Sequence, residues 1–445
     1  MVYLGISPNL QRILSPLIST SPNLINIKLA FNVDGLPLFK SSNVNIWPIL
    51  CQIKSITVEP FVVAIFSGSG KPVPLSTYLE DFVEELKVLI HNGIEINGIT
   101  ISISIYAFVC DAPARSYLKG IKSHSGYSSC ERCIETGDYL NGRVIFKKVH
   151  STKRTDHTFT LQSDESHHLY DSPLVQVPGL GLVSHFAIDY MHNVCLGIMR
   201  KLLNIWISGA LHVRLGNQIV KKISDDILLL SDYIPLEFNR KGRSLQDLQR
   251  WKATEFRTFL LYVSPIVLRD KLDVAMYEHF MLFHVGITIL VSSSHINNIG
   301  ANRAGIYLNE FANHSPNIYG WEFLIYNVHM LCHLHEDCSK YGPLDEFSAF
   351  PYENFLGKLK YFVKSPKKPL QQLCRRIQEL QFLSNSFKNN DQVVPTLEHI
   401  GILPIIYRGR IDIKHFKKVV YNKCTFIIYP VSSYNSYCIT KKKGI

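Results

Sequence analysis

The sequence predicts an α/β protein whose strand-rich first part is interrupted by a long, mainly helical segment. Two patterns carry this prediction: short runs before residue 110 alternate between apolar and polar residues, and apolar residues recur at helical spacing between about 189 and 326. The chain has 445 residues, of which 46% are hydrophobic and 19% charged. At about 150 residues per domain, this length predicts two or three structural units with a large core. Disorder, a collagen repeat and a small disulfide scaffold are excluded.

The first predicted strand ends at an aspartate. Apolar residues alternate with polar ones over 25–33, and Asp34-Gly35 follows directly. Strand-like runs at about 44–56 and 58–66 come next, and the glycine-containing segment 67–72 ends the third. Three strands this close in sequence predict an antiparallel meander with Asp34 at the C-terminal end of its first strand.

A helix and a fourth strand follow. Thr77 and Glu80 have the spacing of a capping box, apolar residues then recur at helical spacing, and Gly93 marks the end of the helix. Residues 99–110 alternate, then become wholly apolar, and end at Asp111. The fourth strand therefore also delivers an aspartate at its end.

The rest of the chain is predicted to be mostly helical. Residues 137–171 are polar and typical of a loop, and a helix that opens at Pro351 carries Glu353 in its first turn. We expect this division: an N-terminal segment 1–24, a first core part with a cysteine pair 25–135, an insertion that is a polar loop and then helical 136–320, a core closure 321–369, and a C-terminal helix and β tail 370–445.

The order of these elements matches a ribonuclease H-like nuclease core, in which acids follow the first and fourth strands and a third acid lies on a later helix. In such a sheet the two strands are neighbours, so Asp34 and Asp111 would share Mg²⁺ or Mn²⁺, with Glu353 completing the site. Asp345 and Glu346 are alternatives for the third acid, but they follow a Gly-Pro break. The simpler interpretation is that Asp34 belongs to an Asp-Gly turn and that Asp111 caps a helix.

Five fragments in a characteristic order point to a family. They are Asp34 to Ser42, Cys110 to Arg115, Cys130-Glu131-Arg132-Cys133, Asp189-Tyr190-Met191-His192 and Phe350-Pro351-Tyr352-Glu353. Over about 25–365 the chain resembles the catalytic region of the CACTA-like (En/Spm-type) DNA transposases. The resemblance implies that Asp34, Asp111 and Glu353 bind the catalytic metal ions, and that the protein cleaves DNA and transfers strands without a covalent protein intermediate.

The resemblance also implies DNA as the partner, a nuclear location, and a homo-oligomer when the protein acts on DNA ends. Relatives carry DNA-end-binding parts before the first strand, and Asp34 lies near the start, so we expect a truncated or partly decayed element. Two alternatives stay open: a domesticated, catalytically inactive descendant that binds DNA or protein, and a zinc-stabilised interaction module.

The Cys130-x-x-Cys133 pair is the one tight pair among ten cysteines, and a tetrahedral structural zinc site needs two more ligands. His329 and His333, four residues apart, are the best candidates, and the antigen-receptor recombinase of vertebrates resembles this arrangement. Two further interpretations are a site completed by His150 and His157, and a reduced pair without a metal.

The charge balance suits an anionic partner. Lys and Arg number 47 against 36 Asp and Glu, a net charge of +11, and DNA is the leading partner. The candidate phosphate contacts are Arg115, Lys358, Lys360 and Lys364, although a solvated lysine face explains the lysines nearly as well. The longest apolar stretch, about 280–291, is shorter than a bilayer-spanning helix and contains His284, so we expect a buried helix and no membrane span.

Overall fold

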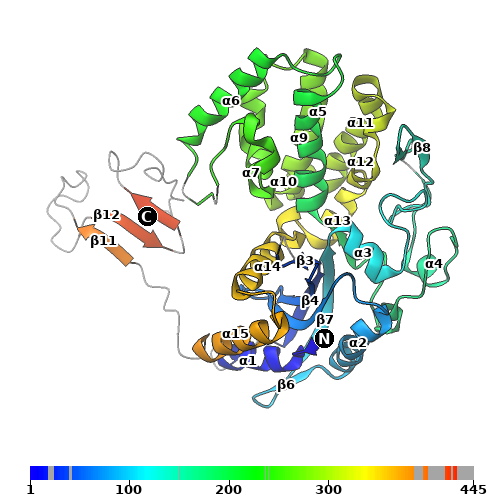
Figure 1. Ribbon diagram of the computed structural model, residues 1–445, viewed down its shortest axis with the longest axis vertical. Helices are drawn as coiled ribbons and strands as arrows, with labels where there is room; N and C mark the ends of the chain where they lie inside the picture. Colours follow the sequence, from blue (N-terminus) through cyan, green and yellow to red (C-terminus); the bar gives the residue numbers. More distant parts are fainter. Residues whose placement is uncertain are drawn as a thin grey trace. The chain divides into compact units, whose positions relative to one another are not determined.

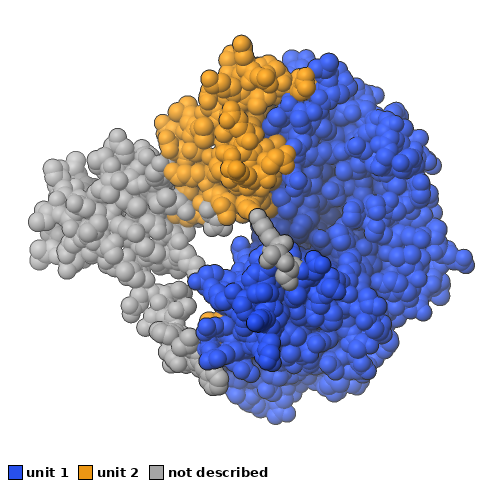
Figure 2. All heavy atoms as spheres, in the orientation of Figure 1, with its two compact units in different colours: residues 1–213, 273–379 blue, residues 214–272, 380–445 orange. Residues whose placement is uncertain are grey.

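The structure is a computed structural model that describes residues 1–18, 25–39, 43–149, 151–235, 237–238 and 240–384, and the backbone of three short strands between 394 and 427. The chain forms two compact units, one of residues 1–213 and 273–379 and one of residues 214–272 and 380–445 (Figure 2). The predicted strand-rich core and most of the helical segment thus belong to the first unit. Part of that helical segment, 214–272, belongs to the second.

The first unit is built on a mixed sheet (Figure 1). Its strands are β1 (Val2–Tyr3), β2 (Asn26–Val33), β3 (Leu36–Pro37), β4 (Asn45–Ile53), β5 (Phe61–Gly68), β6 (Ile94–Ile96), β7 (Ile99–Cys110) and β10 (Phe186–Ile188). The main path is β1-β5-β4-β2-β7-β10, with β3 paired to β4 and β6 paired to β7. Pairing is antiparallel from β1 to β2, whereas β2 with β7 and β7 with β10 are parallel.

This sheet confirms the predicted meander, because β2, β4 and β5 are consecutive antiparallel neighbours. It also confirms that the first and fourth predicted strands, β2 and β7, lie side by side. Phe31 pairs with Phe108 in their register, so the two strands end at the same edge of the sheet. The molecule is therefore an α/β protein with a mixed sheet and a helical region.

Helices α1 (Ser7–Ile18) and α2 (Leu75–Asn92) share one apolar core with the sheet. Gly93 ends α2 with φ of 70°, as predicted. The predicted capping box is wrong: the N-cap is Pro74, and no side chain caps the helix. The helix begins earlier because Leu75 and Tyr78 are buried in the core, which leaves Thr77 exposed on the outer face of its first turn.

The segment between β7 and β10 is more structured than the predicted loop. Within the predicted loop, 137–171, lie α4 (Asp156–Thr160) and a hairpin of β8 (Asp138–Leu140) and β9 (Arg143–Ile145), while α3 (Ala112–Lys119) precedes this range and a 3₁₀ turn (Pro173–Gln176) follows it. Three-residue strands are too short to give a visible alternation, so the sequence did not reveal them.

The remaining helices follow β10. In the first unit they are a π-helical turn (Met191–Met199) that continues into α5 (Arg200–Ser208), then α9 (Val274–Leu290), α10 (Ser293–Ile299), α11 (Ala301–Tyr319), α12 (Tyr326–Leu331), α13 (Leu334–Tyr341) and α14 (Phe350–Phe362), with 3₁₀ turns at Trp321–Phe323 and Leu344–Phe347. In the second unit they are α6 (Asn217–Ser231), a 3₁₀ turn (Leu245–Arg250), α7 (Ala253–Thr258), a π-helical turn (Phe259–Val263) and α8 (Ser264–Val267).

The C-terminal part contains α15 (Pro369–Ser384) and an antiparallel sheet of β11 (Val394–Glu398), β12 (Phe416–Tyr421) and β13 (Cys424–Ile427). The rest of the predicted β tail lies outside the described residues.

Helix α9 contains nearly all of the predicted apolar stretch. Its side chains Phe280, Phe283 and Ile287 are fully buried, so the prediction of a buried helix is confirmed. Across the described residues, no single helix is long and apolar enough to cross a membrane. The pair α9 and α10 passes that test only when taken together, and it is bent by 105°.

Candidate functional site

The three acids that the sequence singled out come from elements that meet at one edge of the sheet. Asp34 directly follows β2 and Asp111 directly follows the parallel neighbour β7. Glu353 lies in the first turn of α14, which Pro351 opens. The Lys360 ammonium of α14 donates to the carbonyl of Pro37, 2.7 Å away, which joins α14 to the chain just beyond Asp34.

These carboxyl groups repel one another, and we call them the acid cluster. Burial, together with the charges of Asp111 and Glu353, raises the pKa of Asp34 from its usual 3.8 to about 8. Burial also raises the pKa of Glu353, and the charges of Asp189 and Asp111 add to that effect. All three acids are only partly buried. A partly open group of mutually repelling carboxylates is the kind of site that a divalent cation stabilises.

The simpler interpretations of Asp34 and Asp111 describe their local bonds correctly. Asp111 Oδ1 accepts a hydrogen bond from the Ala114 amide at 2.8 Å, which caps α3, and Asp34 Oδ1 accepts from the Gly35 amide at 2.7 Å. A Cβ atom on Gly35 would lie 2.6 Å from the ring of Trp47, so only glycine fits beside Asp34. Capping and turn formation therefore hold both carboxylates at the common edge.

A histidine from the fragment Asp189-Tyr190-Met191-His192 joins the acid cluster. His192 Nε2 lies 3.9 Å from Glu353 Oε1, and His192 Nδ1 lies 2.5 Å from Asp189 Oδ2. Burial disfavours a charged ring, but the hydrogen bond and charge of Asp189 and the charges of Asp111 and Glu353 outweigh it and raise the pKa of His192 to about 9. The protonated imidazole therefore offsets part of the repulsion among the acids.

Asp189 holds this arrangement together. Its buried carboxylate accepts from the His192 amide at 2.9 Å and from the Ala349 amide at 2.7 Å, and Ala349 directly precedes α14. The sequence signal was the spacing of Asp189 and His192, three residues apart, which places both groups on one face of a helical turn.

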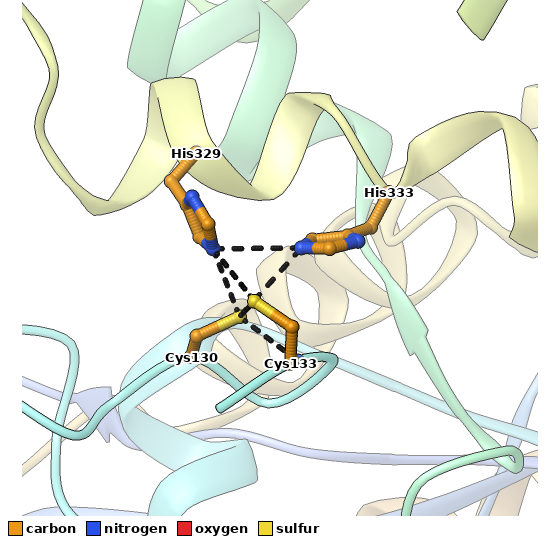
Figure 3. A group of neighbouring side chains, drawn as sticks. All are labelled: Cys130, Cys133, His329 and His333. Atoms are coloured by element: carbon orange, nitrogen blue, oxygen red, sulfur yellow. Dashed lines mark hydrogen bonds between the residues drawn. The ribbon is translucent and has the colours of Figure 1, made fainter. Parts of the chain in front are cut away.

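The structure brings Cys130, Cys133, His329 and His333 together, and we call them the cysteine-histidine cluster. Figure 3 shows both sulfur atoms facing the two Nε2 atoms. Cys130 Sγ lies 3.1 Å from His329 Nε2, 3.7 Å from His333 Nε2 and 3.5 Å from Cys133 Sγ. All four side chains are buried, and their ligand atoms lie within 4.8 Å of one another.

This geometry fits a tetrahedral metal ion. Zinc bound at about 2.3 Å by thiolate and about 2.0 Å by imidazole needs donor atoms separated by roughly 3.3 to 3.8 Å. Although burial opposes it, hydrogen bonds from Cys133 and His329 lower the pKa of Cys130, so the pair already favours a thiolate. The cluster is thus a buried Cys₂His₂ group that can bind a metal ion such as zinc. Of the rival ligands, His157 lies in α4 and His150 lies outside the described residues.

The four-residue spacing of the two histidines is typical of one helix, but the structure places them on two elements. His329 belongs to α12, whereas His333 occupies the N-cap position of α13, after a break at Cys332. The four-residue spacing still directs both rings to the same side, as Figure 3 shows.

The prediction that Arg115 contacts DNA is wrong. Arg115 is 4% exposed, and its guanidinium forms an ion pair with Glu131 at 2.9 Å and donates to the Cys110 carbonyl at 2.8 Å. A cation that is buried and already paired is not accessible to a phosphate group.

The predicted lysines, two on α14 and Lys364 just beyond its end, are exposed and contact the protein surface. Lys358 forms an ion pair with Glu59, Lys360 reaches Pro37, and Lys364 lies over the ring of Tyr361. Lys71 was not predicted as a phosphate contact. This exposed lysine donates to the carbonyl of Pro113, two residues beyond Asp111, at 3.3 Å. Its only signal was its position in the glycine-containing segment after the third strand.

No protein-family model matches this sequence, and no curated protein is significantly similar to it.

Proposed function

We propose that the first unit is a ribonuclease H-like core of a CACTA-like transposase or its descendant, and that it cleaves and joins DNA at the acid cluster. The observation that carries the proposal is the convergence of Asp34, Asp111 and Glu353 from β2, β7 and α14. The strand order β5-β4-β2-β7-β10 supports it, because it places the first and fourth core strands in the centre, parallel to each other.

Asp34, Asp111 and Glu353 would hold Mg²⁺ or Mn²⁺. When bound, such ions activate a water molecule or a 3′-hydroxyl and stabilise the leaving oxygen of a phosphodiester. The protein itself fixes the carboxylates: the α3 cap orients Asp111, the Gly35 amide orients Asp34, and Asp189 anchors the start of α14. His192 keeps a positive charge beside Glu353.

The cysteine-histidine cluster would hold a structural zinc ion. It has four protein ligands and is buried, and closed four-ligand sites of this kind stabilise a fold instead of binding substrate. The ion would join the loop after α3 to α12 and to the start of α13. In the sequence, this loop precedes the helical segment and the two helices follow it.

DNA would be the partner. Lys358 and Lys360 project from the helix that carries Glu353, Lys364 lies two residues beyond its end, and Lys71 lies beside the start of α3. Exposed lysines at these positions would bind phosphate groups on both sides of the acids. The nuclear location and the assembly of a homo-oligomer on DNA ends remain predictions.

The test is cleavage of labelled duplex DNA with Mg²⁺ or Mn²⁺ by the wild type, Asp111→Asn and Glu353→Gln. Asp345→Asn is the matched control, since Asp345 is an exposed acid that the sequence offered as an alternative third ligand. We expect the wild type and the control to nick DNA, and both active-site variants to lose at least about a thousandfold in rate while remaining folded.

Two other outcomes decide between the alternatives. Metal-independent DNA binding by the wild type without any cleavage would favour the domesticated descendant. Weak, salt-insensitive retention of DNA would favour a zinc-stabilised interaction module.

A further inference from the structure

The residues between the two cysteines are both charged and both buried. The side chains of Glu131 and Arg132 are 4% and 10% exposed. Charged residues at such positions are rarely buried unless they are paired. The partners of Glu131 lie on α3, next to the end of β7 and Asp111. The partners of Arg132 lie around the end of β10, next to Asp189.

Glu131 contacts the segment that carries Asp111. Its Oε1 atom accepts from Arg115 Nε at 2.9 Å and its Oε2 atom accepts from Lys119 Nζ at 3.0 Å, and both cations belong to α3. Arg115 in turn donates to the carbonyl of Cys110, the residue before Asp111, at 2.8 Å. Glu131 also accepts from the hydroxyl of Tyr326 at 2.6 Å, at the start of the helix that carries His329.

Arg132 contacts the segment that carries Asp189. Its guanidinium donates to the carbonyl groups of Val183 at 2.7 Å and Phe186 at 2.6 Å. It also forms an ion pair with Asp337 at 2.9 Å, and the same Asp337 oxygen accepts from the Ile188 amide at 2.7 Å. Ile188 ends β10 and directly precedes Asp189, which anchors α14.

We propose that Glu131 and Arg132 are positioning residues, which couple the cysteine-histidine cluster to the acid cluster by fixing the ends of β7 and β10. The inference rests on the proposed function, because it assumes that the acid cluster binds divalent cations. One loop would thus hold the second acid through Arg115 and hold the anchor of the third acid through Asp337.

The chemistry of this network favours a rigid arrangement. Its charged members are almost completely buried: Arg115, Lys119 and Arg132 are the cations, and Glu131 and Asp337 are the anions. Removing one partner leaves an uncompensated buried charge, so the surrounding chain must move. Residues that support metal ligands from behind commonly change metal affinity 10- to 100-fold when they are replaced.

The experiment measures Mn²⁺ affinity of the full chain by electron paramagnetic resonance, with zinc content and far-ultraviolet circular dichroism recorded for each sample. Glu131→Gln removes the charge that pairs with Arg115 and Lys119. Arg115→Lys keeps the charge but loses the fork that reaches the Cys110 carbonyl, so it serves as a second variant if Glu131→Gln does not fold. Asp111→Asn defines which Mn²⁺ site is the acid cluster.

Arg154→Gln is the matched control. Arg154 is buried in the segment between β9 and α4 and donates to the Cys130 carbonyl at 3.0 Å, but its ion-pair partner is Asp164, which belongs to neither strand. Its loss should loosen the cysteine loop without displacing the acids.

We expect Glu131→Gln and Arg115→Lys to retain zinc and to bind Mn²⁺ roughly tenfold more weakly, while Arg154→Gln keeps the wild-type affinity. Unchanged Mn²⁺ affinity in the folded variants would overturn the inference, and so would an equal loss in Arg154→Gln. If the wild type has no Mn²⁺ site that Asp111→Asn removes, the proposed function itself is wrong and the inference falls with it.

Discussion

The acid cluster and the cysteine-histidine cluster both lie in the first unit but have opposite characters. The acid cluster combines residues directly after β2 and β7 with one on α14, and the cysteine-histidine cluster combines two cysteines after α3 with histidines on α12 and at the start of α13. The acid cluster is partly exposed and its members repel one another, whereas the cysteine-histidine cluster is buried and its donor atoms already form a closed set of four. The comparison teaches that one compact unit can hold both a buried, closed set of ligand atoms and a partly exposed group of carboxylates that repel one another.

The difference has a physical basis in the ligands. Thiolates and imidazoles in a closed set of four leave no position for substrate, so such a site contributes to folding. Carboxylates at strand and helix ends keep an open side, and their repulsion is relieved only when a cation or a proton arrives. Zinc bound at the first site would contribute folding energy that offsets the repulsion in the second.

The largest expected effect comes from opening the closed cluster. Cys133→Ser removes one of four ligands, so we expect zinc to be lost and the free energy of unfolding to fall by at least about 5 kcal/mol. Zinc analysis and thermal denaturation measure both effects.

Cys332→Ser is the control for this prediction. Cys332 is a buried cysteine next to His333 that does not belong to the cluster, so its variant should retain zinc. Equal stability of Cys133→Ser and the wild type would show that the cluster carries no metal-dependent folding energy.

A smaller change in the free energy of unfolding, of opposite sign, is expected when Asp34 of the acid cluster is replaced. In the metal-free protein, Asp34 keeps its proton up to about pH 8, whereas the unfolded chain loses it near pH 3.8. Between these values the folded state binds more protons, so this residue's contribution to stability is complete below pH 3.8 and is lost as the pH rises toward 8.

Asp34→Asn should therefore be more stable than the wild type at pH 8, by on the order of 1–2 kcal/mol, with a smaller difference at pH 4. Denaturant unfolding of the metal-free proteins at both pH values measures it, with Asp345→Asn as the exposed control. A destabilised Asp34→Asn at pH 8 would mean that the acids do not repel one another as the structure indicates.

The smallest expected effect concerns the proposed DNA contacts beside the acid cluster. Lys71→Ala removes one exposed cation near the start of α3, so we expect DNA affinity to fall a few-fold and the slope of log affinity against log salt to decrease by about one. Lys28→Ala, an exposed lysine at the opposite end of β2 from Asp34, should leave both quantities unchanged. Equal losses in the two variants would indicate a general charge effect without a localised DNA path.

Local patterns predicted the parts of the fold and site that depend on short stretches of sequence. Alternation over 25–33 and 99–110 identified the strands that end at Asp34 and Asp111, and the Cys-x-x-Cys spacing identified one half of the buried cluster. The strand β10 was missed because three apolar residues give no alternation.

Properties that depend on distant partners were not accessible from the sequence. Arg115 was predicted to contact phosphate because nothing local shows that Glu131 neutralises it in the interior. The role of His192 was undecided because Asp189, which holds it, is itself fixed by the amide of Ala349, 160 residues away. Burial and long-range pairing, which decide these roles, have no signature in residue spacing.

The most direct test of the central claim is the position of two metals in crystals of the protein grown with zinc and soaked in Mn²⁺. Anomalous difference maps at the two absorption edges distinguish the elements. We predict zinc between Cys130, Cys133, His329 and His333, and manganese between Asp34, Asp111 and Glu353. Manganese bound elsewhere, with the three carboxylates unliganded, would contradict the assignment of a DNA-cleaving site to this edge of the sheet.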